Sequence, residues 1–215
     1  MIVYDRQLMA PSVTGKYPEP QNLYNTIKRE TRLHMERVGK YSEFFYRYLC
    51  SNYSDMVRFN VEPEFDEVSE ELFRYHDLGR AYIPGSILNK AGKLTDEERK
   101  IVENHTIYAQ NAINAIYRLP YTEKQIKYYL DIAISHHERY DGNGYPNRMK
   151  KDEIPFLAKV CAVADTFDGI TSWKPYKTVQ TSREKAAEII LSESGKQFEP
   201  FFAERFVEII PYLPE

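Results

Sequence analysis

Histidines at helical spacing constrain the fold of this chain more than any other feature. There are five in 215 residues, and four of them stand on apolar stripes in which residues recur every three or four positions. That spacing puts residues on one face of an α-helix, the face that packs into the interior. A single histidine there is more often an ordinary hydrogen-bonded core residue than a ligand, but that reading must hold on four separate helices. The pattern predicts that imidazoles from distant helices converge on one centre, and the five are His34, His76, His105, His136 and His137.

The same period continues from Leu23 to the end of the chain and predicts a single all-α domain over residues 23–215. We expect roughly seven or more helices in it. Prolines and a glycine interrupt residues 1–20, so residues 1–22 are predicted to form a loosely ordered arm. No strand-like alternation, internal repeat or low-complexity tract competes with this interpretation. Residues that commonly begin helices support it: Thr95 with Glu98 as a capping box, Thr122, Thr181 with Glu184, and Pro200.

Composition narrows the class of partner. The 29 basic and 32 acidic residues give a net charge of −3, so nothing points to a nucleic acid polymer as a partner. No apolar run approaches the roughly 18 residues that span a bilayer, and the first residues do not resemble a signal peptide. Cys50 and Cys161 lie far apart in helical patterns and are typical of reduced thiols. We therefore expect a cytoplasmic protein that does not contact the membrane.

Carboxylates accompany the histidines at the same inward positions. Glu30 lies one turn before His34 on its apolar stripe, where a carboxylate is costly unless something binds it. Asp77 follows His76 directly, and Asp165 lies in an apolar stretch. Adjacent helical residues point roughly 100° apart, so such a pair can bind two neighbouring metal ions, or one ion that straddles the helix.

An aspartate with two oxygens is the natural bridge in a centre with more than one ion. Nitrogen and oxygen ligands without thiolate favour iron or manganese, with zinc and nickel as alternatives, and the spacing does not choose among them. The sequence thus predicts a polynuclear metal site, and an enzyme is the first hypothesis for the function.

The segment from Asp141 to Pro146 follows the histidine pair directly and contains two glycines. On its own it would be interpreted as a tight turn that ends a helix. Behind two candidate ligands, it is expected to lie at the mouth of the metal site, where glycine lets the backbone approach a ligand closely. Tyr145 would then be able to stack on a base or to hydrogen-bond a phosphate.

Taken together, the motifs of this chain resemble those of the HD-GYP family. Its members are bacterial phosphodiesterases of the HD superfamily that cleave cyclic di-GMP. The resemblance runs from about Leu23 to the end of the chain, and the run after His136 is highly specific. It implies a single helical HD-type domain around the metal site. The motifs that carry it are His76-Asp77-Leu78-Gly79-Arg80, Ile83-Pro84, Leu88 to Thr95, His105-Thr106, His136 to Pro146, Ala164 to Asp168, and Lys174-Pro175-Tyr176-Lys177.

The resemblance also implies roles for individual residues. Two or three divalent ions, iron or manganese, would be bound, with Asp77 as the bridge and Glu30 at the position that holds a third ion in some members. Asp77, Arg80 and Lys177 would be catalytic. The substrate would contact Arg80, Tyr145, Lys174 and Lys177. The implied metal ligands are Glu30, His34, His76, Asp77, His105, His136, His137 and Asp165.

The implied reaction is hydrolysis of cyclic di-GMP to the linear dinucleotide and then to GMP. Three departures from the family pattern bear on the substrate: Arg80 replaces a lysine, and Lys174 and Lys159 replace arginines. Arginine offers a planar two-pronged donor and lysine a point charge, so the swaps are not neutral at a phosphate.

Two alternatives therefore stay open. One is a sensor of cyclic dinucleotides, or a module that docks a signalling protein through the Gly144-Tyr145-Pro146 loop, with little turnover. The other is an HD phosphohydrolase that acts on another nucleotide.

Overall fold

Helices make up all the regular structure in residues 20–116, 121–172 and 180–215, the ranges that the computed structural model describes. No strand occurs within these ranges, which confirms the predicted all-α fold. No helix in the same ranges is long and apolar enough to span a bilayer. Lys174, Lys177 and most of the predicted N-terminal arm lie outside the described residues. The helix bounds are α1 (Pro20–Thr26), α2 (Arg29–Asn52), α3 (Ser54–Asn60), α4 (Ser69–Arg74), α5 (Gly85–Leu88), α6 (Asp96–Glu103), α7 (His105–Ile116), α8 (Glu123–Ser135), α9 (Phe156–Thr171), α10 (Arg183–Ser192) and α11 (Pro200–Ile209), with short 3₁₀ helices η2 (Pro63–Phe65), η3 (Tyr75–Tyr82), η4 (Lys151–Glu153) and η5 (Ile210–Tyr212).

Capping residues begin the helices largely where the sequence predicted. The Thr95 hydroxyl accepts from the backbone of Glu98 at the start of α6, in a reciprocal capping box. Thr122 begins α8 in the same way. The prediction of Thr181 as the cap of α10 is wrong by one residue, because Ser182 accepts from the backbone of Lys185 instead. Helix α1 also begins at Pro20, inside the range predicted as an arm.

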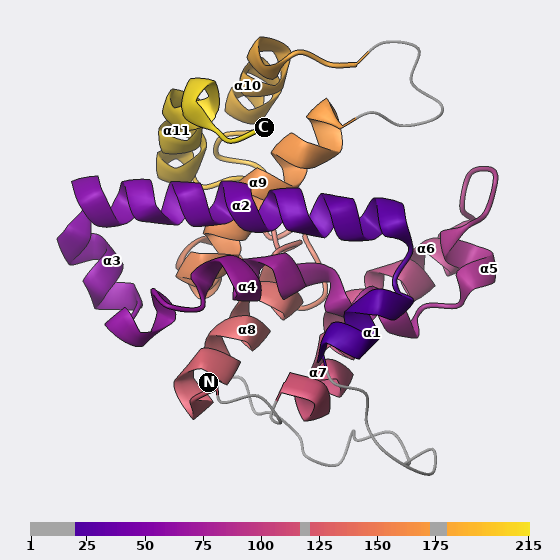
Figure 1. Ribbon diagram of the computed structural model, residues 1–215. Coiled ribbons are helices and arrows are strands. Elements are labelled where there is room, and N and C mark those ends of the chain that lie inside the picture. The colour runs from indigo at the N-terminus through magenta and orange to yellow at the C-terminus, as the bar shows by residue number, and fades with distance from the viewer. Residues whose placement is uncertain (1–19, 117–120, 173–179) are drawn as a thin grey trace.

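The long helix α2 organises the molecule. It crosses the middle of the fold, with α10 and α11 on one side and α4, α7 and α8 on the other, while α9 passes behind it (Figure 1). It packs directly against both α4 and α9. His34 lies on α2, and its ring lies 5.4 Å from that of His76 on η3.

Aromatic side chains on α2 fix its position in the core. The Phe45 ring lies 5.2 Å from that of Phe206 on α11, edge to face. The Tyr46 ring lies 5.1 Å from that of Phe65 on the opposite side of the helix. All four rings are fully buried, and burial of each such side chain stabilises the fold by roughly 1.5–3 kcal/mol. The core therefore holds α2 from two sides and leaves its first turns free to build the site.

Gly79 allows η3 to lie against the start of α7. A Cβ atom at this position would collide with the backbone carbonyl of His105 and with the backbone nitrogen of Ala109. Only glycine permits this approach, which brings Asp77 on η3 beside His105 on α7.

Candidate metal centre

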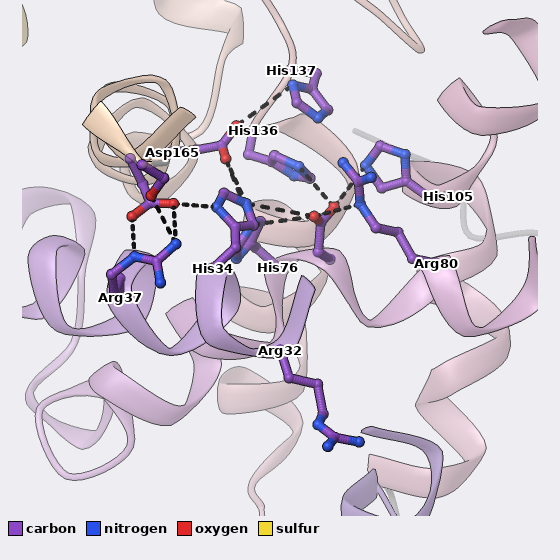
Figure 2. A network of polar contacts seen from close by, with 12 residues as sticks. Arg32, His34, Arg37, His76, Arg80, His105, His136, His137 and Asp165 are labelled. Carbon is purple, nitrogen blue, oxygen red and sulfur yellow. Dashed lines mark hydrogen bonds and ion pairs between the residues drawn. The ribbon is translucent and has the colours of Figure 1, made fainter. Parts of the chain in front are cut away.

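Histidines and aspartates from five parts of the chain meet in one buried cluster. Figure 2 shows the rings of His34, His76, His105, His136 and His137 directed toward a common centre. Two groups of ligand atoms lie close enough to hold a metal ion each, with all atoms of a group within 4.8 Å of one another. Both groups contain Asp77. The first is Asp77 with His105, His136 and His137, and the second is Asp77 with His34 and His76.

Asp77 turns one carboxylate oxygen to each group. Its Oδ1 lies 3.1 Å from Nε2 of His105 and 3.8 Å from Nε2 of His136. Its Oδ2 lies 3.8 Å from Nε2 of His34 and 3.7 Å from Nε2 of His76. Such a carboxylate can bind one ion through each oxygen. The bridging role that the family resemblance implies for Asp77 stays a prediction.

Asp165 on α9 spans the two groups from the opposite side. Its Oδ1 lies 3.0 Å from Nε2 of His34 and 3.9 Å from Nε2 of His76. Its Oδ2 lies 4.0 Å from Nδ1 of His137. The carboxylates of Asp77 and Asp165 thus reach both parts of the cluster.

Three of the histidine rings are oriented by the backbone of their own segment. In each, Nδ1 lies within hydrogen-bond distance of a carbonyl three or four residues earlier, so Nδ1–H donates and Nε2 keeps its lone pair. This leaves the metal-binding nitrogen directed at the cluster. The bonds are His76 to Phe73 (2.9 Å), His105 to Val102 (2.6 Å) and His136 to Ala133 (3.1 Å).

His34 is oriented differently, by a side chain far away in sequence. Its Nδ1 lies 2.7 Å from Oδ2 of Asp168, which is 1% exposed. Arg37 holds that carboxylate, donating from Nε to Oδ1 at 2.5 Å and from Nη2 to Oδ2 at 3.0 Å. A carboxylate behind a metal-binding histidine fixes the ring and raises its basicity. Neither Arg37 nor Asp168 was predicted as a site residue, although Asp168 lies on the inward stripe of its helix.

The cluster passes a chemical test for bound cations. Nε2 of His76, His105 and His136, and both oxygens of Asp77, are buried and make no hydrogen bond in the described part of the chain, although Arg80 forms an ion pair with Oδ2 of Asp77. A buried polar atom without a partner costs roughly 1–3 kcal/mol, and more if it is charged. Divalent cations would satisfy all these atoms at once. The donors are nitrogen and oxygen without thiolate, which suits iron, manganese or zinc.

The protonation states of the histidines and of Asp77 also favour binding of a metal cation. Burial lowers the pKa of His76 and lowers that of His136 well below its ordinary value. Burial likewise lowers the pKa of His137 to about 3. Burial opposes a charge on Asp77, but the Arg80 guanidinium and the neighbouring imidazoles outweigh it and hold the pKa of that carboxyl well below its usual value. Neutral imidazoles around an ionised carboxylate are the forms that bind metal.

His34 again behaves differently. Burial opposes its protonation, but the hydrogen bonds to Asp165 and Asp168 outweigh burial and raise its pKa to about 10. With protein groups alone, His34 is therefore a cation that pairs with these carboxylates. A metal ion bound at this position would replace that proton, so binding there releases H⁺.

Arg80 lies at the edge of the cluster. Its Nε lies 2.5 Å from Oδ2 of Asp77, one turn away on η3. This contact places the guanidinium of Arg80, labelled in Figure 2, beside the carboxylate that both ligand groups share. The predicted contact of Arg80 with the substrate stays a prediction.

The loop after His137 is fixed against the cluster. The Tyr145 ring packs on the His137 ring, with centroids 4.8 Å apart and planes 32° apart. A Cβ at Gly144 would collide with the backbone of Glu138 and Arg139, so only glycine permits this close return. The Glu138 carboxylate, which sequence reasoning missed, accepts from the backbone N–H of Asn147 at 2.7 Å and of Met149 at 2.9 Å.

Not every predicted residue reaches the cluster. Glu30 lies one turn before His34 as predicted, but its side chain is 71% exposed and lies 3.9 Å from Nζ of Lys28. The prediction that it lies on a buried stripe is therefore wrong, because its side chain is left exposed at the first turn of α2. Lys159 bonds Glu199 at 2.6 Å and braces α9 against the start of α11. Lys174 and Lys177 lie outside the described residues, so their roles remain predictions.

Comparison with known proteins agrees with this geometry. A family model described as the HD domain matches residues 72–201. The chain is 34% identical over 192 residues to a 3′3′-cGAMP-specific phosphodiesterase 2 of Vibrio cholerae, covering 87% of this chain and 33% of that protein. It is 38% identical over 184 residues to a cyclic di-GMP phosphodiesterase of Thermotoga maritima, covering 84% of this chain and 45% of that protein. The chain thus spans less than half the length of these relatives.

A solved structure shares the fold. The protein Bd1817 of Bdellovibrio bacteriovorus, described as an HDG"Y"P protein, matches with a TM-score of 0.60 at 15% identity, over 89% of this chain and 57% of that one. At this identity the match concerns the fold alone. The resemblance seen in the motifs is confirmed by the family model and the relatives, and the chain belongs to the HD domain family.

Proposed function

We propose that this protein is a metal-dependent phosphodiesterase that hydrolyses cyclic di-GMP to the linear dinucleotide and then to GMP. The observation that carries the proposal is the pair of ligand groups that share the buried carboxylate of Asp77. Similarity to phosphodiesterases named for cyclic di-GMP and for 3′3′-cGAMP supports the substrate class. We propose iron or manganese as the metal, in two or three ions, because the donor set lacks thiolate.

Bound divalent ions supply Lewis-acid stabilisation of phosphate oxygens and activation of water. The protein residues position these ions and the substrate. Asp77 and Asp165 set the distance between the two ligand groups, and the bonds at Nδ1 hold the rings in place. Arg80 and Lys177 are proposed to offset negative charge on the phosphate as it is cut. Tyr145 and Lys174 are proposed to hold the nucleotide beside the centre.

The setting of the reaction is part of the proposal. We place it in the cytoplasm, where Cys50 and Cys161, both free thiols, would stay reduced. The Gly144-Tyr145-Pro146 loop is proposed as a contact for a signalling protein.

A second candidate is hydrolysis of a hybrid cyclic dinucleotide. It is favoured by the similarity to a 3′3′-cGAMP-specific enzyme and by Arg80, whose donor geometry differs from that of the family's lysine. A protein that senses the same ligands without turnover is the remaining alternative.

One experiment separates these candidates. The protein is purified without oxygen, its metal content is measured by elemental analysis, and it is incubated with cyclic di-GMP, 3′3′-cyclic GMP-AMP and cyclic di-AMP. Chromatography of the products is expected to show linear dinucleotide and GMP from cyclic di-GMP. The Asp77→Asn variant is the inactive control. Faster cleavage of 3′3′-cyclic GMP-AMP would favour the second candidate. Tight binding of a cyclic dinucleotide to the metal-loaded protein without product would favour the sensor instead.

A further inference from the structure

A cleft of about 610 Å³ opens beside the metal centre. One wall is formed by the end of α6 and the start of α7, and the other by residues 142–148. Both walls continue directly into metal ligands, because Asn104 precedes His105 and the loop follows His137. Tyr145 lines the cleft while its ring packs on His137, so the cleft reaches the edge of the centre. A ligand held at the metals can extend into it.

The lining combines the groups that bind a nucleotide. Ile107 lines the cleft and is 44% exposed, which is unusual for a large apolar side chain and provides a surface for a flat base. Asn104 lies in the same wall and offers an amide. Lys100 and Arg148 contribute one cation from each wall, and neither side chain has an ion pair within the described residues.

Glu103 is the unusual member of this lining. Its carboxylate is half-buried in the cleft and has no hydrogen bond or ion pair with another described residue, although Lys100 lies one turn away. An ionised carboxylate only accepts hydrogen bonds. Guanine presents two neighbouring donors, N1–H and the N2 amine, that match its two oxygens. Adenine presents an unprotonated N1 at the same edge, which would face a carboxylate oxygen without a proton between them.

Arg148 is held in a conformation that disfavours it. Its φ is 55°, in the left-handed region where glycine is far more favourable than a residue with a Cβ atom. Strained residues of this kind gather at functional sites, and an arginine here directs a two-pronged phosphate donor from the loop. Lys151 shares this backbone conformation, with φ of 52°, but does not line the cleft.

We propose that the cleft binds the guanine and the adjoining phosphate of the half of the cyclic dinucleotide that lies away from the metals. In this assignment Glu103 determines the preference for guanine over adenine. Lys100 and Arg148 bind the distal phosphate. The inference rests on the proposed function for its substrate, but base recognition by the cleft can be measured without turnover.

The first test compares Glu103→Gln with the unaltered metal-loaded protein. We expect the KM for cyclic di-GMP to rise about 10- to 100-fold, with kcat nearly unchanged. The glutamine amide keeps one acceptor oxygen, but its NH₂ group would face one of the two guanine donors, so that donor loses its acceptor. Cleavage of cyclic di-AMP should be unchanged or improved. Glu97→Gln, an exposed position on the same helix, is the control and should match the unaltered protein. Equal changes in KM for all substrates, or none, would overturn the assignment.

The second test avoids catalysis. GMP and AMP are bound to the metal-loaded full chain in equilibrium dialysis, and GMP is expected to bind at least about tenfold more tightly, with that preference lost in Glu103→Gln. If no cyclic dinucleotide is cut but this preference persists, the proposed function fails and the cleft assignment stands. If cyclic di-GMP is cut but GMP and AMP bind equally, the cleft assignment fails alone.

The third test uses Arg148→Gly, which removes the guanidinium and relieves the backbone. It should therefore fold well and raise the KM for every cyclic dinucleotide about tenfold, because the distal phosphate is common to all of them. Lys151→Gly relieves the same backbone conformation outside the cleft and should leave KM unchanged. An unchanged KM in Arg148→Gly would remove Arg148 from the site.

Discussion

The histidines of the centre are held in place by two different means. His76, His105 and His136 donate to backbone carbonyls three or four residues earlier in the chain. His34 depends on Asp168, 134 residues away, and this carboxylate depends in turn on Arg37. We refer to the first three rings as the locally held side of the centre, and to His34 with Asp168 and Arg37 as its long-range side. His76 is held locally but shares its ligand group with His34.

Burial separates the two sides as well. The side chain of His105 is 1% exposed, while that of His34 is 20% exposed. The locally held rings are set as soon as their own segments fold. The long-range side exists only when α2 and α9 are packed together, because His34 and Asp168 lie on those two helices. We therefore expect the ion on the His34 side to bind more weakly and to be lost first when the fold is disturbed.

The largest effect should come from Asp77→Asn, because Asp77 belongs to both ligand groups. Both ions should be lost and turnover should fall to background. An ion at about 100 times its dissociation constant stabilises a fold by about 2.7 kcal/mol. At this chain length 1 kcal/mol corresponds to about 2–4 °C, so loss of two ions should lower the Tm by about 10–20 °C. Elemental analysis and thermal unfolding of the holoprotein measure this, and chelation of the unaltered protein should reproduce it.

Asp131→Asn is the matched control for that variant. Asp131 is also a buried carboxylate, but its partner is Lys127 and it lies outside both ligand groups. It should keep its metal and its turnover. Retention of both ions in Asp77→Asn would contradict the shared bridge.

The second effect separates the two sides. The carboxylate of Asp168 accepts from His34 and Arg37 through its two oxygens. Asp168→Asn replaces it with a neutral amide that keeps only one acceptor oxygen, so the His34 ring loses its fixed orientation. Loss of such an outer partner typically weakens metal affinity 10- to 100-fold. We expect this loss for one ion only, measured by competition with a chelator. Equal weakening of both ions would show that the centre responds as one unit.

Asp66→Asn is the control for Asp168→Asn. Asp66 also pairs with an arginine, at 2.7 Å from Arg58, and accepts from the Tyr46 hydroxyl at 2.6 Å, but it lies away from the centre. This variant should lower stability while both metal affinities stay unchanged.

The same division explains what the sequence could predict. Helical period and adjacent motif residues predicted that His76, Asp77, His105 and the His136-His137 pair come together, and the structure brings them into one cluster. The rings of His76, His105 and His136 are oriented within one turn of chain. The pairing of His34 with Asp168 could not be predicted, because it depends on how α2 crosses α9. Glu30 shows the limit of periodicity: it has the spacing of a buried position, but at the end of a helix no neighbour covers it.

A smaller effect should follow from Arg37→Lys. Lysine keeps the positive charge beside Asp168 but loses the two-pronged donor that also reaches Oγ of Ser172 at 2.8 Å. We expect affinity for the ion on the His34 side to fall about two- to tenfold, less than in Asp168→Asn. Arg47→Lys, which alters an arginine paired with Glu43 on the same helix, should leave affinity unchanged. A loss as large as that of Asp168→Asn would show that the carboxylate alone cannot orient His34.

The smallest effect on the two-ion centre is expected from Glu30→Gln. Its carboxylate is exposed and its ion pair with Lys28 is worth about 0–1 kcal/mol, so stability should barely change. If Glu30 holds a third ion, as the family resemblance implies, the variant should bind two ions instead of three. It should then open cyclic di-GMP normally but accumulate the linear dinucleotide, as chromatography would show. Glu43→Gln on the same helix should still form GMP. Loss of an ion from the two-ion centre would instead make Glu30 part of the long-range side. If Glu30→Gln forms as much GMP as the unaltered protein, Glu30 does not belong to the site.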